Sequence, residues 1–552
     1  MTLESEGATR QWDYIVVGAG SAGSVVANKL SGPGGGSVLL LEAGGPATDI
    51  RHRIPAAARQ LWYNPSCTWM FSTVGEPGLQ GRRVPVARGM VLGGSSAING
   101  GVYNRGSRFD YESWAERGLP LWTYAAVVPY FKRIERHWSR SPQYGTDGPV
   151  PVTQLQVKSP LTPRALNAAQ EMGFPLAEHA AGAEPEGWGL PTMNVDERGR
   201  RITSADAFLS PIRHRPNLRI ETRARVLRIL IEKGRAIGVE YLHGSERRVA
   251  HATREVVLSG GAVSSPAILL LSGVGPADEL RAVGVETRLD LPGVGRNFND
   301  QPAGFVQFKS KLPLTFERSL RLDRLAVAAL RWGLGLSSPL SGPPVIASAN
   351  LRTARAGKAP DLRMMLTAAT INSRPWFPGI AKGAGHLVAG MFALGHPKSR
   401  GSITLASADP LAPPNILYNI LTHADDIADI RRAYYLMREL VSQPSFADVV
   451  GEFVMPASTP TTDAEVDSYI RSVVRTTAHP LGSCQMGVGV DAVVDEQCRV
   501  RGIDALRVID LSVFPVQISG NPHGPAMMLA DRVTDMMLGK PLLPTELPTV
   551  VH

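Results

Sequence analysis

A glycine-rich pattern close to the N-terminus limits the fold of this chain more than any other feature. The apolar run at residues 14–17 is followed at once by G-x-G-x-x-G, with glycines at Gly18, Gly20 and Gly23. The next residues have helical apolar spacing, and residues 37–41 have the composition of a second buried strand. A strand, a tight glycine turn, a helix and a strand in this order are typical of a dinucleotide-binding unit.

Each of the three glycines, and the acid that follows them, has a physical role in such a unit. Gly18 permits the tight turn, Gly20 lets the backbone approach a pyrophosphate, and Gly23 lets the helix pack against the strand. Glu42 ends the second strand, where its carboxylate can accept hydrogen bonds from ribose hydroxyls. The pattern therefore predicts a nucleotide site, although this unit alone suits NAD as well as FAD.

Composition limits the remaining classes of function. A chain of 552 residues is too long for one core, so we expect two or more domains. The chain is 43% hydrophobic and 19% charged, which indicates a globular protein and not a disordered one. The net charge of +9 is spread along the sequence without a basic tail, so we predict no nucleic-acid partner.

The cysteines and the apolar runs bear on location. Cys67, Cys484 and Cys498 form no CxxC pair, so we predict neither a disulfide framework nor a metal site, and a reducing compartment. No signal peptide and no membrane-spanning run is readable, which favours the cytoplasm. Residues 325–336 are the strongest apolar stretch. We interpret them as a packed helix or a lid, with membrane contact as the alternative.

Several local structures are predicted from pattern alone. Residues 44–84 have no sustained period and indicate an extended loop region, and residues 217–241 contain three strands of a small β-meander. Pro129 is expected to interrupt a helix, and Ser264 with Pro266 to start one. Gly93 and Gly94, ahead of an expected helix at residues 98–99, suit either close approach of a ring or phosphate, or a simple helix cap.

Five ordered motifs resemble those of the glucose-methanol-choline (GMC) family of FAD-dependent oxidoreductases. The resemblance extends from about residue 12 to about residue 540. The motifs are Gly18/Gly20/Gly23 with Glu42, LGGSSAIN at 92–99, GGAVSSPAILLLSGVG at 260–275, HPLGSCQMG at 479–487 and SGNPHGPAMMLADR at 519–532.

The resemblance implies a mixed α/β fold with two domains. Residues 12–155, 200–300 and 475–545 would form a discontinuous Rossmann-type FAD domain. Residues 156–199 and 301–474 would form a substrate domain with an antiparallel sheet and helices.

Membership would also imply a set of FAD contacts. Val226 would present its backbone to the adenine, and Asp510 would touch the ribityl chain; from residue type alone they are a core valine and a strand-end acid. The flavin-linking histidine of covalent members is replaced by Ile98, so noncovalent FAD is expected. Met90 stands where members often carry a basic residue, so one charge near the cofactor is missing. The full set is Gly18, Gly20, Ser21, Ala22, Gly23, Glu42, Ala43, Leu92, Gly93, Gly94, Ser95, Asn99, Gly100, Val102, Val226, Gly260, Asp510, Pro522 and His523.

The predicted chemistry lies near the C-terminus. His479 precedes Pro480 in a turn, and histidine can accept an alcohol proton near neutral pH. Within HPLGSCQMG we predict it to be the catalytic base. Its polar partner is Asn521 or His523. The resemblance favours Asn521, while the chemistry of His523 would also suit that role.

The predicted activity is oxidation of a primary or secondary alcohol, with oxygen or a quinone-like molecule as electron acceptor. A lyase or decarboxylase that keeps FAD without net oxidation, and a flavin-binding protein without turnover, are the alternatives. The sequence shows no cage for choline. It does not identify the alcohol or the oligomeric state.

Overall fold

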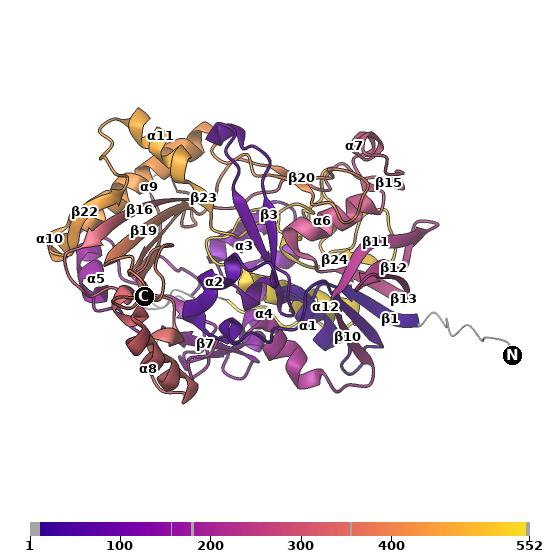
Figure 1. Ribbon diagram of the computed structural model, residues 1–552. Helices are drawn as coiled ribbons and strands as arrows, with labels where there is room; N and C mark the ends of the chain where they lie inside the picture. The colour runs from indigo at the N-terminus through magenta and orange to yellow at the C-terminus, as the bar shows by residue number, and fades with distance from the viewer. Residues whose placement is uncertain (1–10, 156, 178–181, 354–355, 548–552) are drawn as a thin grey trace.

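The computed structural model describes residues 11–547 except 156, 178–181 and 354–355. Figure 1 shows two groups of strands on opposite sides of the molecule, with helix α12 (His523–Met537) between them. The predicted mixed α/β fold is confirmed. All three cysteines are free and buried. Most of the N-terminal segment in which we looked for a signal peptide lies outside the described residues.

The first sheet contains the predicted nucleotide unit. β1 (Gln11–Val17) lies between β2 (Val38–Glu42) and β13 (Glu246–Leu258), and both pairings are parallel. β24 (Leu506–Val508) extends the parallel part beside β13. β1 and β2 are almost entirely buried, as expected for parallel strands covered on both faces.

The predicted β-meander is wrong in its first strand. β10 (Leu218–Thr222) pairs with β2 in parallel, at the other end of the sheet. The antiparallel meander consists instead of β11 (Ala224–Glu232), β12 (Arg235–His243) and β13. The short gap between β10 and β11 suggested a hairpin. Instead, β10 pairs with the edge of β2 that β1 leaves free.

Two helices contain a proline that we expected to mark an interruption or a start. α4 (Tyr124–Ile134) continues through Pro129, and α6 (Gly261–Leu271) begins before Ser264 and contains Pro266. A proline leaves the carbonyl four residues earlier without its helical donor. Here the Glu546 backbone N–H donates to Ala125 O, and the Ser483 hydroxyl donates to Ala262 O. These distant donors offset the loss, so neither helix breaks.

The second large sheet is antiparallel. Its order is β22 (Val450–Met455), β16 (Pro302–Ser310), β19 (Leu387–Leu394), β18 (Leu362–Thr367), β17 (Val345–Leu351) and β8 (Gly187–Gly189), with β23 (Arg475–Thr476) also beside β16. Helix α9 (Ala424–Ser442) packs on β16 and β19. Alternate residues of β18 are buried, so its other face is left for the cavity described below.

Residues 44–84 are not simply a loop. They contain the short helix α2 (Ala58–Trp62) and β3 (Thr68–Ser72), which pairs with β4 (Pro85–Gly89). The expected helix after Gly94 is a single 3₁₀ turn, Gly94–Ala97, because Ile98 leaves the helical conformation.

α8 (Leu322–Gly333) includes most of the apolar stretch at 325–336. Ala328 and Trp332 are buried, as expected of a packed helix, whereas Val327 and Leu330 are exposed. In the part of the chain that the structure describes, no helix combines the length and apolarity needed to cross a bilayer.

The remaining helices and strands are short. They are α1 (Ser21–Leu30), α3 (Arg108–Glu116), α5 (Thr162–Glu171), α7 (Ala277–Ala282), α10 (Pro444–Ala447), α11 (Asp463–Val473), β5 (Val102–Tyr103), β6 (Glu135–His137), β7 (Val150–Gln154), β9 (Thr192–Met193), β14 (Val274–Gly275), β15 (Leu289–Asp290), β20 (Ser402–Thr404) and β21 (Asn415–Leu417).

Candidate active site

A cavity of about 880 Å³ connects the two sheets. Its wall includes Gly18 and Glu42 from the first sheet and His479 and Asn521 at the far end. The cavity is within the size range of small-molecule and cofactor sites. It therefore brings the predicted cofactor residues and the predicted catalytic residues to one space, although they are far apart in the sequence.

Most of the predicted cofactor residues line this cavity. Three do not: Gly23, Leu92 and Gly93 lie behind its wall. Leu92 N–H donates to Gly45 O, and Gly93 N–H donates to Ala19 O. The residues that do line it are Gly18, Gly20, Ser21, Ala22, Glu42, Ala43, Gly94, Ser95, Asn99, Gly100, Val102, Val226, Gly260, Asp510, Pro522 and His523.

The glycine turn after β1 has no space for side chains. Gly18 has φ +96°, and a Cβ there would lie 2.5 Å from Ser259 O. A Cβ on Gly94 would lie 2.7 Å from the Cα of Gly20, and one on Gly23 would collide with Gly18 O. The turn thus presents bare backbone at the N-terminus of α1, which fits the pyrophosphate of a dinucleotide.

Glu42 lies beside this turn and is fully buried. Its Oε2 accepts from Ala19 N–H at 2.9 Å and its Oε1 from Gly44 N–H at 2.8 Å. Burial raises the pKa of Glu42 to about 7, against the opposing effect of these two amides. Each oxygen keeps acceptor capacity for a ribose hydroxyl, so this carboxylate fits the nucleoside half of FAD.

Asp510 connects the end of β24 to the start of α6. Its Oδ2 accepts from Gly261 N–H and from the Ser265 hydroxyl, and its Oδ1 accepts from Ser512 N–H at 2.8 Å. Burial raises its pKa. The side chain reaches the cavity and also caps a turn, so both interpretations of this acid have support in its contacts.

His479 and Asn521 face each other at the far end of the cavity. The His479 Nε2 and Asn521 Nδ2 atoms are 3.2 Å apart. His523 lies elsewhere: its Nδ1 is 2.8 Å from the Ser21 hydroxyl, at the glycine turn. Asp300 fixes the backbone of His479, because its Oδ1 accepts from the His479 backbone N–H at 2.9 Å.

The hydrogen-bond network determines which ring nitrogen of His479 is free. Gln301 Nε2 donates to Gly395 O and Ile518 O, so its Oε1 must face His479 Nδ1, at 3.0 Å. A carbonyl oxygen accepts only, so Nδ1 donates to it. Arg363 Nη1 also lies 3.2 Å from Nδ1, but its two hydrogens have acceptors in Gln301 Oε1 and Gly520 O. Nδ1 therefore carries the proton and Nε2 keeps its lone pair. Nε2 is the nitrogen that faces Asn521 in the cavity.

Arg363, from β18, also belongs to this network and was not predicted from sequence. Its Nη1 donates to Gln301 Oε1 at 2.8 Å and its Nη2 donates to Asn521 Oδ1 at 2.7 Å. The second bond orients the Asn521 amide with its NH₂ group toward His479. The only signal in the sequence was one arginine within an otherwise apolar strand, LRMMLT.

Burial and the neighbouring charges change the pKa of His479. Shielding from water, then the positive charges of Arg363 and Arg88, hold the pKa of His479 well below 6.5. Burial lowers the pKa of Arg363 to about 10, which leaves the guanidinium charged at neutral pH. The imidazole is therefore neutral and ready to accept a proton at neutral pH.

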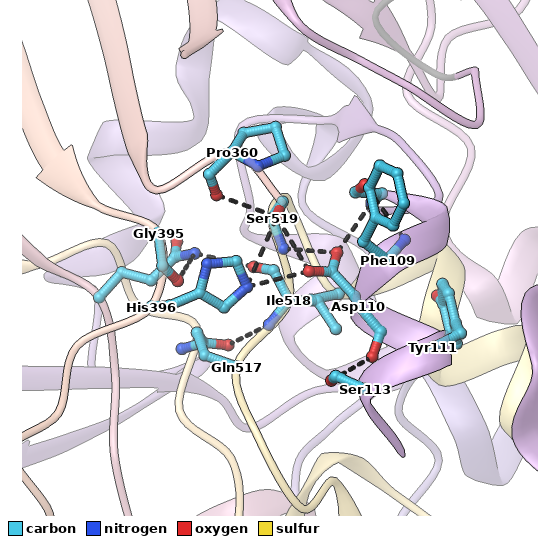
Figure 2. Close-up of polar contacts among 12 residues, drawn as sticks. Phe109, Asp110, Tyr111, Ser113, Pro360, Gly395, His396, Gln517, Ile518 and Ser519 are labelled. Carbon is cyan, nitrogen blue, oxygen red and sulfur yellow. Dashed lines mark hydrogen bonds and ion pairs between the residues drawn. The ribbon is translucent and has the colours of Figure 1, made fainter. Parts of the chain in front are cut away.

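The segment that carries Asn521 is anchored by a buried acid (Figure 2). Asp110 Oδ2 accepts from Ser519 N–H at 2.8 Å, while its Oδ1 lies 2.9 Å from both the Ser519 hydroxyl and His396 Nε2. The Ser519 hydroxyl also contacts Pro360 O, just before β18. Asp110 thus connects α3, the Asn521 segment and the approach to Arg363.

Comparisons with known proteins place this chain among related sequences. The family description GMC oxidoreductase matches residues 12–303 with its N-terminal part and 397–530 with its C-terminal part. An oxygen-dependent choline dehydrogenase of Sinorhizobium medicae is 37% identical over 538 residues, which cover 96% of each chain. One of Burkholderia pseudomallei strain 1710b is 38% identical over 537 residues, 96% of this chain and 94% of the relative.

Solved structures show the same architecture. Pyridoxine 4-oxidase from Mesorbium loti has a TM-score of 0.85 at 30% identity, covering 95% of this chain and 98% of its own. A formate oxidase from Aspergillus oryzae, studied for its FAD modification, has a TM-score of 0.88 at 25% identity, covering 96% and 98%.

We expect Gly23→Ala to lose FAD, because the added Cβ would push α1 away from the glycine turn. Overpacking of this kind costs about 1–3 kcal/mol, which corresponds to roughly 5- to 140-fold weaker FAD binding. Flavin absorbance per protein after gel filtration measures the loss. The matched control is Gly333→Ala, whose Cβ would enter open space. Full FAD content in both variants would contradict this role for Gly23.

Proposed function

The chain belongs to the GMC oxidoreductase family and is an FAD-dependent enzyme acting on CH–OH donors, and on this premise we propose how it oxidises an alcohol. The substrate is a primary or secondary alcohol, and the product is an aldehyde or ketone. The observation that carries the proposal is the pair His479 Nε2 and Asn521 Nδ2, 3.2 Å apart in the wall of the cavity.

In the proposed reaction the alcohol hydroxyl replaces the contact between these two side chains. His479 Nε2 accepts the hydroxyl proton, while the O–H bond breaks. The Asn521 amide N–H and the adjacent positive charge of Arg363 stabilise the negative charge that develops on the oxygen. Bound FAD supplies the acceptor, at flavin N5, for the hydride that leaves the carbinol carbon.

The remaining features of the cofactor follow from the same site. We propose noncovalent FAD, because Ile98 stands where covalent relatives would require a nucleophilic side chain. The proposed electron acceptor is oxygen, since the relatives at 37–38% identity are oxygen-dependent by name. A quinone-like acceptor is the alternative, and reoxidation rates with oxygen and with a quinone dye would separate the two.

The central test is anaerobic reduction of the bound flavin by a panel of alcohols. We expect bleaching in the wild type, and a rate of reduction about 10²–10⁴-fold lower in His479→Ala, which removes the base. FAD content should be unchanged. The matched control is His214→Ala, an exposed histidine outside the cavity.

Two results would contradict this proposal. Reduction of His479→Ala within about tenfold of the wild type would show that His479 is not the base. No bleaching of the wild type by any alcohol would favour a lyase, a decarboxylase or a flavin-binding protein without turnover.

A second comparison assigns the polar partner of His479. We expect Asn521→Ala to slow flavin reduction with normal FAD content, because its amide N–H holds the substrate oxygen. His523→Ala should mainly weaken FAD retention, because His523 contacts Ser21 at the glycine turn. Stopped-flow reduction and flavin content give both quantities. The reverse pattern would make His523 the partner.

The pH dependence of flavin reduction follows from the lowered pKa of His479. A base must be neutral to accept a proton, so the rate falls only when the pH drops through that pKa. We expect the wild-type rate to stay level from neutral pH to well below 6.5. Arg363→Met removes a positive charge that lowers this pKa, so its acidic limb should move to higher pH. Stopped-flow pH profiles would measure this shift. A wild-type limb at about 6.5, unchanged in the variant, would contradict this explanation.

A further inference from the structure

The half of the cavity around His479 is lined by arginines. Of the six arginines in the cavity wall, Arg225 belongs to β11 of the first sheet, and the other five are Arg59, Arg82, Arg88, Arg363 and Arg475. Two carboxylates also line the cavity, Glu42 and Asp510, and both lie at the predicted cofactor end with their oxygens bonded to backbone amides. The part that must receive the alcohol therefore has an excess of fixed positive charge.

Three of these arginines form one cluster. Arg475 lies in β23, four residues before the base, and its Nη1 contacts the Tyr63 hydroxyl at 3.4 Å. Its charge acts on both Arg59 and Arg82, and burial followed by this repulsion lowers the pKa of Arg82. Arg475 itself is exposed, whereas Arg59 and Arg82 are half-buried. Like charges held close together repel one another, and a bound anion would relieve this repulsion.

Among the described residues, two acids act on this charge, and both do so without an ion pair. None of the five arginines lies within ion-pair distance of a described carboxylate; Arg82 and Arg88 donate to backbone carbonyls instead. Glu76 and Asp300, whose charges reach Arg82 and Arg363, accept from backbone N–H groups. They offset part of the positive charge of Arg82, Arg88 and Arg363.

A quaternary ammonium substrate is poorly suited to this site. Aromatic side chains such as Phe305 and Tyr63 do line the cavity and could offer cation–π contacts. Such contacts contribute about 0.5–2 kcal/mol, whereas a cation here would face several arginines at low effective dielectric. The relatives are choline dehydrogenases by name, but the positive charge of this site is unfavourable for a cation such as choline.

We propose that the substrate is an alcohol that also carries a carboxylate, which binds at Arg475 and its neighbours Arg59 and Arg82 while the hydroxyl reaches His479. This inference rests on the proposed alcohol oxidation and specifies its substrate class. Arginine suits the planar carboxylate because it can donate two parallel hydrogen bonds. The same charges select against cationic alcohols.

The test uses three alcohols of similar size and different charge. They are 3-hydroxy-2,2-dimethylpropanoate, 3,3-dimethylbutan-1-ol and choline, which are anionic, neutral and cationic. Anaerobic flavin reduction by the holoenzyme should give kcat/KM for the anion at least about tenfold above the neutral alcohol, with choline lowest. The wild type should also bind 3,3-dimethylbutanoate, which has no hydroxyl, as seen by a change in the flavin spectrum.

The variant Arg475→Gln tests the position of the carboxylate. The ratio of kcat/KM for anion over neutral alcohol should fall by about tenfold, and the spectral affinity for 3,3-dimethylbutanoate should fall with it. The matched control is Arg281→Gln, an exposed arginine of α7 outside the cavity, which should leave both quantities unchanged.

The outcomes separate this inference from the proposed function. If no alcohol of any charge reduces the flavin, alcohol oxidation itself is wrong, and this inference with it. If the neutral alcohol reduces the flavin and choline equals or exceeds the anion, alcohol oxidation stands and the carboxylate proposal is overturned. An unchanged ratio in Arg475→Gln, or loss of FAD from that variant alone, overturns the assigned carboxylate site.

Discussion

The rest of the cofactor site depends on one close approach of backbones. Gly18 touches Ser259, Gly23 touches Gly18, and Gly94 touches Gly20, each at a distance that excludes a Cβ. The glycine turn, Gly94 and Ser259 are far apart in the sequence, yet their backbones are in direct contact with no side chain between them. Because the turn also ends β1, its position sets where α1 begins and where a phosphate can approach.

The reactive end is built on the opposite principle, with polar side chains that satisfy each other. Gln301 orients His479, and Arg363 orients Asn521. Asp110 fixes the segment that carries Asn521 by accepting from Ser519 N–H. A network of this kind has value only when every member is paired, since a buried unpaired polar group costs about 1–3 kcal/mol. This requirement explains why an arginine of the second sheet belongs to the same network as His479 of the HPLGSCQMG motif.

The sequence was sufficient to predict those features of the site that depend on residues close together in the chain. The glycine turn, Glu42 and His479 each belong to short motifs whose spacing has a physical meaning, and the structure places all of them on one cavity. Long-range pairing was not predictable: β10 joins β2, and Arg363 meets Gln301 and Asn521 only after two sheets have folded. The effects of Pro129 and Pro266 were mispredicted for the same reason. The carbonyls of Ala125 and Ala262, which these prolines leave without a helical donor, accept from Glu546 N–H and from the Ser483 hydroxyl.

The segment that carries His479 is attached at both ends to different halves of the molecule. Before it, Arg475 and Thr476 pair with β16 of the second sheet. After it, Gly482 and Cys484 donate to Leu511 and Ser512, next to the first sheet. A hinge motion between the two sheets would strain the segment between Thr476 and Gly482 and would displace the His479 imidazole. The position of the imidazole therefore depends on both sheets at once.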